Sequence, residues 1–138
     1  MSAVAHKDKI AQVKVIATED IFSRILNEME DRHINMDMIN FFTEKKAFAL
    51  DVSNLEEVEN ILKQYDIEYE IKPDCAKVTL IGNKVTETPG VIAKIMRALN
   101  AENVTLLQSS DSYNSLSCLV DEKDMVTTVH VIHNAFSV

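Results

Sequence analysis

The chain has 138 residues, of which 46% are hydrophobic and 26% are charged, and its formal net charge is −8. This apolar content is sufficient for a folded core, so the composition excludes a chain that is disordered throughout. The acidic balance argues against nucleic acid and anionic membranes as partners, and no apolar run reaches the roughly 18–20 residues that cross a membrane.

The segment 10–73 predicts strands and helices in the order βαββαβ. Alternating apolar residues indicate a first strand over 10–17. Thr18 can then cap a helix that runs to about Arg32, because two acidic residues follow it and suit the positive end of a helix dipole. The further elements expected are a strand over 34–39, a turn region over 41–46, a strand over 47–52, a helix with a capping box of Ser53 and Glu56, and a strand over 67–71 ended by Pro73.

The segment 74–138 predicts the same order without its last strand. A strand over 75–82 leads through a loop to Thr88, which we expect to cap a helix that has Pro89 at its first position. The elements expected after that helix are a strand over 104–108, a turn over 109–114, a strand over 115–120 and a helix that opens at Asp121 and Asp124 and runs to Phe136.

The two segments are copies of one supersecondary unit. Five apolar residues of the first helix recur seventy positions later with the same helical spacing, and the same offset relates Ile34 to Val104 and Asp51 to Asp121. The two apolar sets are Ile21, Phe22, Ile25, Leu26 and Met29, and Val91, Ile92, Ile95, Met96 and Leu99.

The second copy needs a fourth strand, and the first ten residues are the only ones left to supply it. Because a βαββα unit leaves one sheet position empty, we expect residues of about 3–8 to fill that position. The predicted fold class is therefore α+β, with two ferredoxin-like βαββαβ units over 10–73 and 74–138. The N-terminal strand completes the second unit, so the two units are interlocked.

Few residues suggest catalysis or metal binding. His130 and His133 lie three apart on a helix, but no third ligand accompanies them at matching spacing, so we interpret them as surface histidines and expect no metal site. Cys75 and Cys118 lie on separate strands among apolar neighbours, which favours buried, reduced thiols in a cytoplasmic protein. No general acid, base and electrophile are grouped, so we predict no catalytic residues.

The first copy offers a binding site for an amino acid. Backbone N–H groups at the start of the helix after Thr18 suit a carboxylate. On the following strand, Asp37 could hold an ammonium group, and Asn35 could add hydrogen bonds. Two interpretations stay open: an amino-acid pocket, or an Asp37 that is an ordinary exposed strand residue.

Several segments of the chain carry a more specific signal than apolar spacing. In the second copy they are VTLIG at 78–82, TPGVIAKIM at 88–96, LQSSDS at 107–112, 120–124 and 130–136, and in the first copy they are IAQVKV at 10–15 and INMDMI at 34–39. Together these segments resemble the tandem ACT domains that regulate aspartokinases, and the resemblance is more specific in the second copy than in the first. The LQSSDS segment is most similar to the Gram-positive, diaminopimelate-sensitive type of aspartokinase.

The resemblance implies the regulatory region of an enzyme that phosphorylates aspartate with ATP, the first step towards lysine, threonine and diaminopimelate. It implies a catalytic kinase domain upstream, which binds ATP and begins with a Lys-Phe-Gly-Gly motif that this chain lacks. We therefore expect no cofactor in this region, and interpret the chain as a fragment or a separately made regulatory subunit. The resemblance also implies interlocked ACT domains and a homodimer formed through them.

Carried over by position, the resemblance implies one set of effector-binding residues: Thr18, Ile21, Phe22, Asn35, Met36 and Asp37. The leading hypothesis is an allosteric sensor that binds lysine, threonine or meso-diaminopimelate as its small amino-acid effector. The alternative is a dimerisation module that binds no ligand, because the first copy lacks the Pro-Gly pair that the second has at Pro89-Gly90. A standalone enzyme is a distant third possibility.

Overall fold

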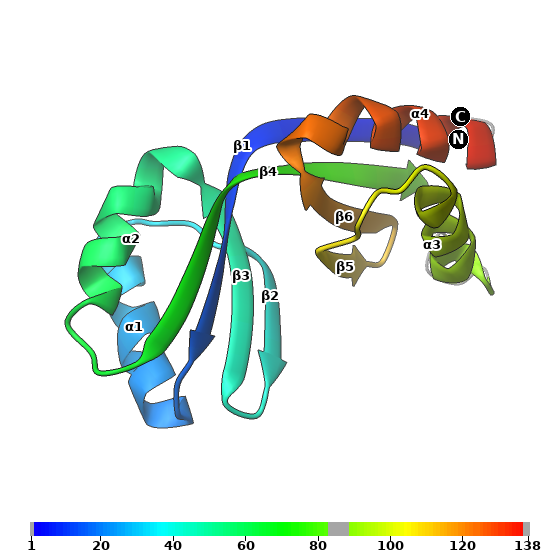
Figure 1. The fold of residues 1–138 in the computed structure, drawn as a ribbon. Helices are drawn as coiled ribbons and strands as arrows, with labels where there is room; N and C mark the ends of the chain where they lie inside the picture. Colours follow the sequence, from blue (N-terminus) through cyan, green and yellow to red (C-terminus); the bar gives the residue numbers. More distant parts are fainter. Residues whose placement is uncertain (1, 83–88, 137–138) are drawn as a thin grey trace. The chain divides into compact units, whose positions relative to one another are not determined.

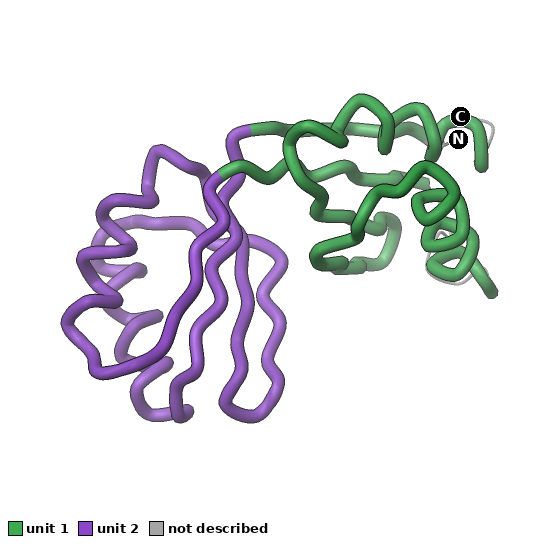
Figure 2. The backbone as a smooth tube through the Cα atoms, viewed as in Figure 1, with its two compact units in different colours: residues 1–8, 74–138 green, residues 9–73 purple. Residues whose placement is uncertain are grey.

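The computed structural model describes residues 2–82 and 89–136, which are drawn in colour in Figure 1. The chain forms two compact units, shown in Figure 2. Unit 2 comprises residues 9–73, and unit 1 comprises residues 1–8 together with 74–138. Each unit is therefore built around one of the two copies recognised in the sequence.

Unit 2 is a sheet covered on one face by two helices. Its elements are the later part of β1 (Ser2–Ile16), α1 (Glu19–Asp31), β2 (Asp37–Phe42), β3 (Lys45–Asp51), α2 (Leu55–Leu62) and the first part of β4 (Glu68–Gly82). The strands follow the order β2-β3-β1-β4, and β3 pairs antiparallel with both β1 and β2. This is the strand order of a ferredoxin-like unit.

Unit 1 repeats this arrangement. Its elements are the later part of β4, α3 (Val91–Ala101), β5 (Gln108–Ser112), β6 (Ser115–Asp121), α4 (Met125–Phe136) and the first part of β1. The strands follow the order β5-β6-β4-β1. The predicted fold class is confirmed, since the N-terminal strand takes the fourth position in the sheet of the second copy.

One long strand replaces the two strands that were expected on either side of Pro73. Strand β4 runs from Glu68 to Gly82 without a break, so the prediction that Pro73 ends a strand is wrong. Proline lacks a backbone N–H, but a strand can lose a single donor where no ladder hydrogen bond needs it.

The second strand of each copy begins later than predicted. Strands β2 and β5 occupy 37–42 and 108–112 rather than 34–39 and 104–108. The apolar residues Ile34 and Val104 instead close the preceding helices, donating hydrogen bonds to Met29 O at 2.9 Å and Leu99 O at 3.0 Å. His33 and Asn103, just before them, have φ of 57° and 58°. This is the Schellman ending of a helix, and it uses apolar residues that the alternation had assigned to strands.

The helix starts agree with the sequence in part. Thr18 caps α1 as predicted, but Ser53 caps nothing in the expected capping box. Asp51 Oδ1 accepts from the backbone N–H of Ser53 at 2.9 Å, and Asp121 Oδ1 accepts from that of Lys123 at 3.0 Å, so each aspartate opens a short 3₁₀ turn before its helix. Helix α3 begins after Gly90, whose φ is +80°, rather than at Pro89; Thr88 lies outside the described residues.

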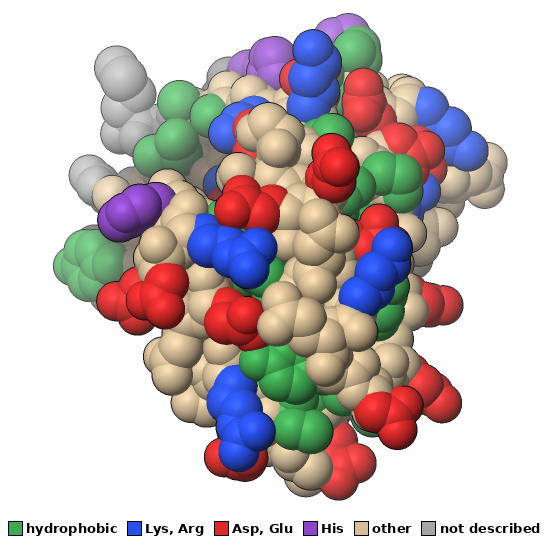
Figure 3. All heavy atoms as spheres, turned by 90° about the vertical axis from the view of Figure 1, so that its left-hand side faces the viewer, with side chains coloured by type: hydrophobic (Ala, Val, Ile, Leu, Met, Phe, Trp, Pro, Cys, Tyr) green, Lys and Arg blue, Asp and Glu red, His purple; other side chains and the backbone are tan. Residues whose placement is uncertain are grey.

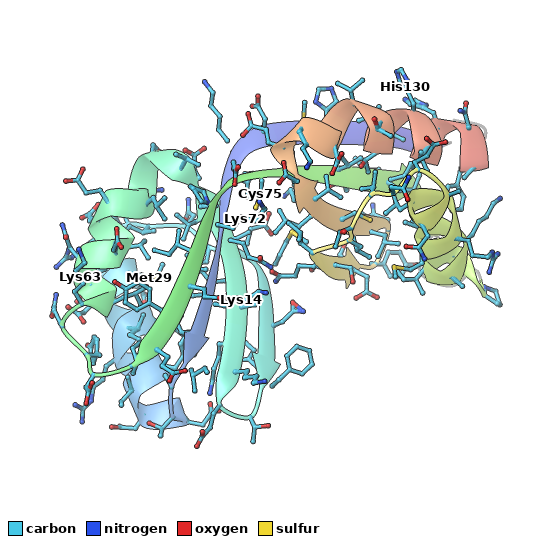
Figure 4. All side chains as sticks on the ribbon, viewed as in Figure 1. Lys14, Met29, Lys63, Lys72, Cys75 and His130 are labelled. Carbon is cyan, nitrogen blue, oxygen red and sulfur yellow. The ribbon has the colours of Figure 1, made fainter. Side chains whose placement is uncertain are left out.

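Each unit has its own core between its helices and one face of its sheet. In unit 2, Met29 is among the residues buried there, and Figure 4 labels it. The unit 2 core also holds two buried phenylalanines, Phe22 and Phe48, whereas the buried core of unit 1 is built from aliphatic residues and Cys118.

Candidate functional site

The junction between β1 and α1 forms the first part of the predicted site. Thr18 Oγ1 accepts a hydrogen bond from the backbone N–H of Ile21 at 3.4 Å. Glu19 and Asp20 follow in the first turn, and the Asp20 carboxylate lies 3.1 Å from the guanidinium of Arg24. The helix N-terminus is thus supplied with oxygen acceptors from its own sequence, and these compensate the positive end of the dipole.

A buried lysine closes this junction. The side chain of Lys46 on β3 is fully buried. Its ammonium group donates to the carbonyl oxygens of Ala17, at 2.8 Å, and Thr43, and it lies 3.0 Å from a carboxylate oxygen of Glu19. It also lies 5.7 Å from the centre of the Phe22 ring. A buried charge is tolerated here because it is paired and hydrogen-bonded.

Ile21 and Phe22 belong to the core more than to a surface pocket. Ile21 is half-buried and packs against the core of unit 2, and Phe22 is 1% exposed. The Phe22 ring makes an edge contact with Phe41, at 5.6 Å between centroids, and a tilted contact with Phe48, at 6.3 Å. A ligand at this junction would therefore contact backbone and polar groups before it reached these two side chains.

Asn35, Met36 and Asp37 lie where the chain enters β2. Asn35 is exposed and Met36 is half-buried against the core of unit 2. Asp37 is exposed, and its Oδ1 accepts from the backbone N–H of Met38 at 2.8 Å. Met38 has φ of 52°, and the pairing of β2 with β3 shifts register between Asp37 and Asn40. Asp37 therefore stabilises a bulge at the start of the strand.

The structure does not bring the six predicted residues together within one copy. Asp37 pairs with Ala49 of β3, and Ala49 pairs in turn with Gln12 of β1. Thr18 lies beyond Ile16, the last residue of β1, and therefore at the opposite end of the sheet from Asp37. The 13 residues of α1 separate the two groups, a rise on the order of 20 Å. The expectation that Asp37 lies beside the N-terminus of α1 in its own copy is wrong, because the chain returns along the full helix before β2 begins.

A concave surface of unit 2 was missed by the sequence interpretation. It encloses about 810 Å³ and is lined by Lys14, Val15, Ile16, Phe42, Lys45, Lys46, Ala47, Ile67, Glu68, Tyr69 and Glu70. None of the six predicted residues lines it. A sequence pattern could have indicated it. Glu68 and Glu70 are two residues apart on β4 and therefore share one face of that strand, and lysines occur on the strands β1 and β3.

The cysteines and His130 lie where the sequence interpretation expected them. Cys75 and Cys118 are buried free thiols, and burial raises the pKa of the Cys118 thiol to about 12. His130 is exposed and points away from α4 in Figure 4. Among residues 2–82 and 89–136, no three His, Cys, Asp or Glu side chains are grouped so as to hold a metal ion.

The helix-covered side of unit 2 carries charges of both signs. Figure 3 shows acidic and basic side chains interspersed over the face that carries α1 and α2. Ion pairs on this face include Asp20 with Arg24 and Glu57 with Arg32. Exposed pairs of this kind contribute little to stability, typically less than about 1 kcal/mol each. In the described part of the chain, no helix is long and apolar enough to cross a membrane.

Known proteins share this arrangement. A family model described as the ACT domain matches residues 70–134. Aspartokinase 1 of Bacillus subtilis (strain 168) is 28% identical over 139 residues, which cover 99% of this chain and 34% of that relative. The chain resembles the regulatory region of an aspartokinase. It spans about a third of the length of the curated aspartokinases that it matches.

Solved structures match this chain along nearly its whole length. A structure of aspartokinase alpha and beta subunits superimposes with a TM-score of 0.89 and 26% identity, covering 99% of this chain and 98% of that chain. The ligand-free regulatory subunit of aspartate kinase from Thermus thermophilus has the same fold, with a TM-score of 0.87, 23% identity and 97% of each chain covered. Both structures therefore share the fold of the two units, and the ACT-domain model matches residues 70–134 of the chain.

Proposed function

We propose that this chain is a cytoplasmic regulatory region that controls the phosphorylation of aspartate by ATP in an attached or associated catalytic kinase domain. The observation that carries the proposal is the 28% identity with Bacillus subtilis aspartokinase 1 along 99% of the chain. ATP would bind the catalytic domain, and this region needs no cofactor of its own. Its partner in regulation is an end-product amino acid: lysine, threonine or meso-diaminopimelate.

A lysine complex of a protein with this fold supports an amino-acid effector. Escherichia coli aspartokinase III, solved with lysine and aspartate, superimposes with a TM-score of 0.75 and 20% identity, covering 97% of this chain and 33% of that chain. Sensing requires that the effector bind one state of the kinase more tightly than the other, so binding alone would not regulate.

Pairing of two copies would assemble the two halves of the predicted site. Strand β2 lies at an edge of the sheet and exposes Phe41 and Phe42, which are 55% and 65% exposed. If β2 pairs antiparallel with β2 of a second copy, the start of one strand meets the end of the other. Asp37 of one copy then lies at the end of the sheet where Thr18 of the other copy begins α1. A homodimer would therefore place a carboxylate opposite a helix N-terminus, which suits an amino acid.

Calorimetric titration with lysine, threonine and meso-diaminopimelate tests this proposal. We expect one of them to bind, and Asp37→Ala to weaken the binding at least tenfold, because a carboxylate that pairs with an ammonium group is lost. Asp66→Ala is the matched control, since Asp66 is an exposed acid of the same unit outside the predicted site. Absence of binding by all three amino acids, or equal binding by the two variants, would contradict the proposed effector site.

A ligand-free dimerisation module is the second candidate function. It is favoured by the apolar edge of β2 and by the Asp37 carboxylate, which already accepts a hydrogen bond from its own backbone. Edge strands with exposed apolar side chains are sites of pairing between chains. Analytical ultracentrifugation separates the two functions: a module that binds no ligand gives dimers whose dissociation constant does not change with any of the three amino acids.

A further inference from the structure

The ammonium group of Lys46 has as many acceptors as it has hydrogens. A lysine ammonium carries three N–H donors and no acceptor. In unit 2 these donors face the carbonyl oxygens of Ala17 and Thr43 and a carboxylate oxygen of Glu19. The three acceptors come from separate segments: the end of β1, the β2–β3 turn and the first turn of α1. One cation therefore connects three parts of the unit.

The surroundings of the ammonium group exclude water on its remaining sides. The side chain of Lys46 is fully buried, and the face of the buried Phe22 ring lies 5.7 Å from the nitrogen. Two carbonyl oxygens, one carboxylate and an aromatic face are groups that recognise a primary ammonium ion. The set resembles the inside of an amine-binding site more than the environment of a surface lysine.

Unit 1 shows that the fold does not itself require a cation at this position. The residue seventy positions after Lys46 is Leu116, which is buried. Both units keep the backbone hydrogen bond from the strand end to the turn: Ala17 N donates to Glu44 O in unit 2, and Gly82 N donates to Asn114 O in unit 1, each at 2.9 Å. The cation is thus a property of unit 2 added to a shared backbone frame.

We propose that the β1–α1 junction of unit 2 is a binding site for a primary ammonium group, which the chain fills with Lys46 as a tethered ligand. The inference goes beyond the proposed function, because it holds whether or not an amino-acid effector binds. A tethered group competes at a high effective concentration. Free amines and the ammonium groups of amino acids are therefore excluded from this site in the native chain, and Lys46 holds the start of α1 to the β2–β3 turn.

Truncation of Lys46 turns the proposal into a ligand-binding experiment. Lys46→Ala removes three methylene groups and the ammonium, which together correspond to n-propylammonium. We expect Lys46→Ala to have a lower melting temperature than the native chain, and n-propylammonium chloride to raise it in a saturable manner, because a ligand that binds only the folded state stabilises it. Equal concentrations of n-propanol and of sodium chloride are the solvent and salt controls.

The native chain and Lys45→Ala are the matched protein controls. Lys45 is the exposed neighbour of Lys46 on β3, so Lys45→Ala removes the same atoms without opening the site. We expect n-propylammonium to leave both controls unchanged. The proposal is overturned if the amine raises the melting temperature of Lys46→Ala no more than that of the two controls.

If Lys46→Ala does not fold, nuclear magnetic resonance of the native chain tests the proposed ammonium site. In a ¹⁵N-labelled sample, the Lys46 ammonium should exchange its hydrogens slowly with water and show nuclear Overhauser contacts to the Phe22 ring. Lys46→Met should remove this signal, and Glu19→Gln should shift it and speed its exchange. A Lys46 ammonium that exchanges as fast as that of Lys45 would rule out the proposed site.

Discussion

The two units share a backbone frame but differ in what fills it. The same offset of seventy residues relates the aspartates that open the 3₁₀ turns, Asp51 and Asp121, and the helix endings at His33 and Asn103. Capping and helix-closing interactions are thus retained in both units. These local hydrogen bonds set the path of the chain in the same way in both units. The cores of the two units, in contrast, contain different residues.

The two units differ most near the N-terminus of their first helix, where the first strand leads into it. Three positions show this: unit 2 has Phe41, Lys46 and Phe48 where unit 1 has Asp111, Leu116 and Cys118. The connection differs as well, since α1 begins at Glu19, two positions after Ala17, and α3 begins at Val91, nine positions after Gly82. A short connection, aromatic packing and a buried cation therefore occur together in unit 2.

The largest effect expected from this difference concerns Phe48. Phe48→Ala should lower the free energy of unfolding by about 3–5 kcal/mol, because it removes a fully buried ring that contacts Phe22. Cys118→Ala, at the equivalent position of unit 1, removes far less apolar volume and should cost roughly 1 kcal/mol. Urea unfolding followed by circular dichroism measures both. Equal losses of unfolding free energy in the two variants would contradict the prediction, because they would show that these two core positions contribute equally to stability.

A smaller effect is expected from the Cys118 thiol at alkaline pH. Burial raises its pKa from 9.0 to about 12, so the folded chain retains a proton that the unfolded chain releases. The stability contribution is complete below pH 9 and is lost as the pH rises towards 12, at about 1.4 kcal/mol per pH unit at most. Phe48 has no ionisable group at the equivalent position, so unit 2 has no counterpart of this effect.

Comparison of the native chain with Cys118→Ala tests this pH dependence. The difference in unfolding free energy between the two proteins should be constant from pH 7 to 8.5 and should then move against the native chain by on the order of 1 kcal/mol at pH 10. A difference that does not change with pH would mean that the thiol ionises as easily in the folded as in the unfolded chain.

Much of the fold could be predicted because it depends on local patterns. The helical spacing of apolar residues located α1 and α3, and the shortage of one strand in the second copy indicated that the N-terminal segment completes it. Strand boundaries were less predictable. Ile34 and Val104 look like strand residues from their alternation, yet each closes a helix through a hydrogen bond to a carbonyl five residues earlier.

The candidate site was less predictable because its parts are remote in sequence. Lys46 stands beside Lys45 in a polar segment, 29 positions from the carbonyl of Ala17 that accepts its hydrogen bond. No local pattern distinguishes the buried lysine from the exposed one. Asp37 and Thr18 could be named from the sequence, but their separation along α1 follows only from the direction in which β2 runs.

The smallest effect expected is the loss of a hydrogen bond between the two helices of unit 2. Tyr65 Oη donates to Glu28 Oε2 at 2.5 Å, and the positions seventy residues later, Ala98 and Ala135, carry no such groups. Tyr65→Phe should cost about 0.5–1 kcal/mol, which is below the usual range for hydrogen bonds to charged groups because the pair is only half-buried. Tyr69→Phe removes a hydroxyl elsewhere in unit 2 and is the control.

The pH dependence of this cost separates the hydrogen bond from a loss of packing. The hydrogen bond to Glu28 raises the pKa of Tyr65 above 10, with contributions from burial and from the negative charge of Glu28. The stability it provides is therefore complete below pH 10 and is lost as the pH rises above that value. The cost of Tyr65→Phe should be constant between pH 7 and 9 and should shrink above pH 10. A cost that persisted there would indicate a loss of packing between α1 and α2 rather than of the hydrogen bond.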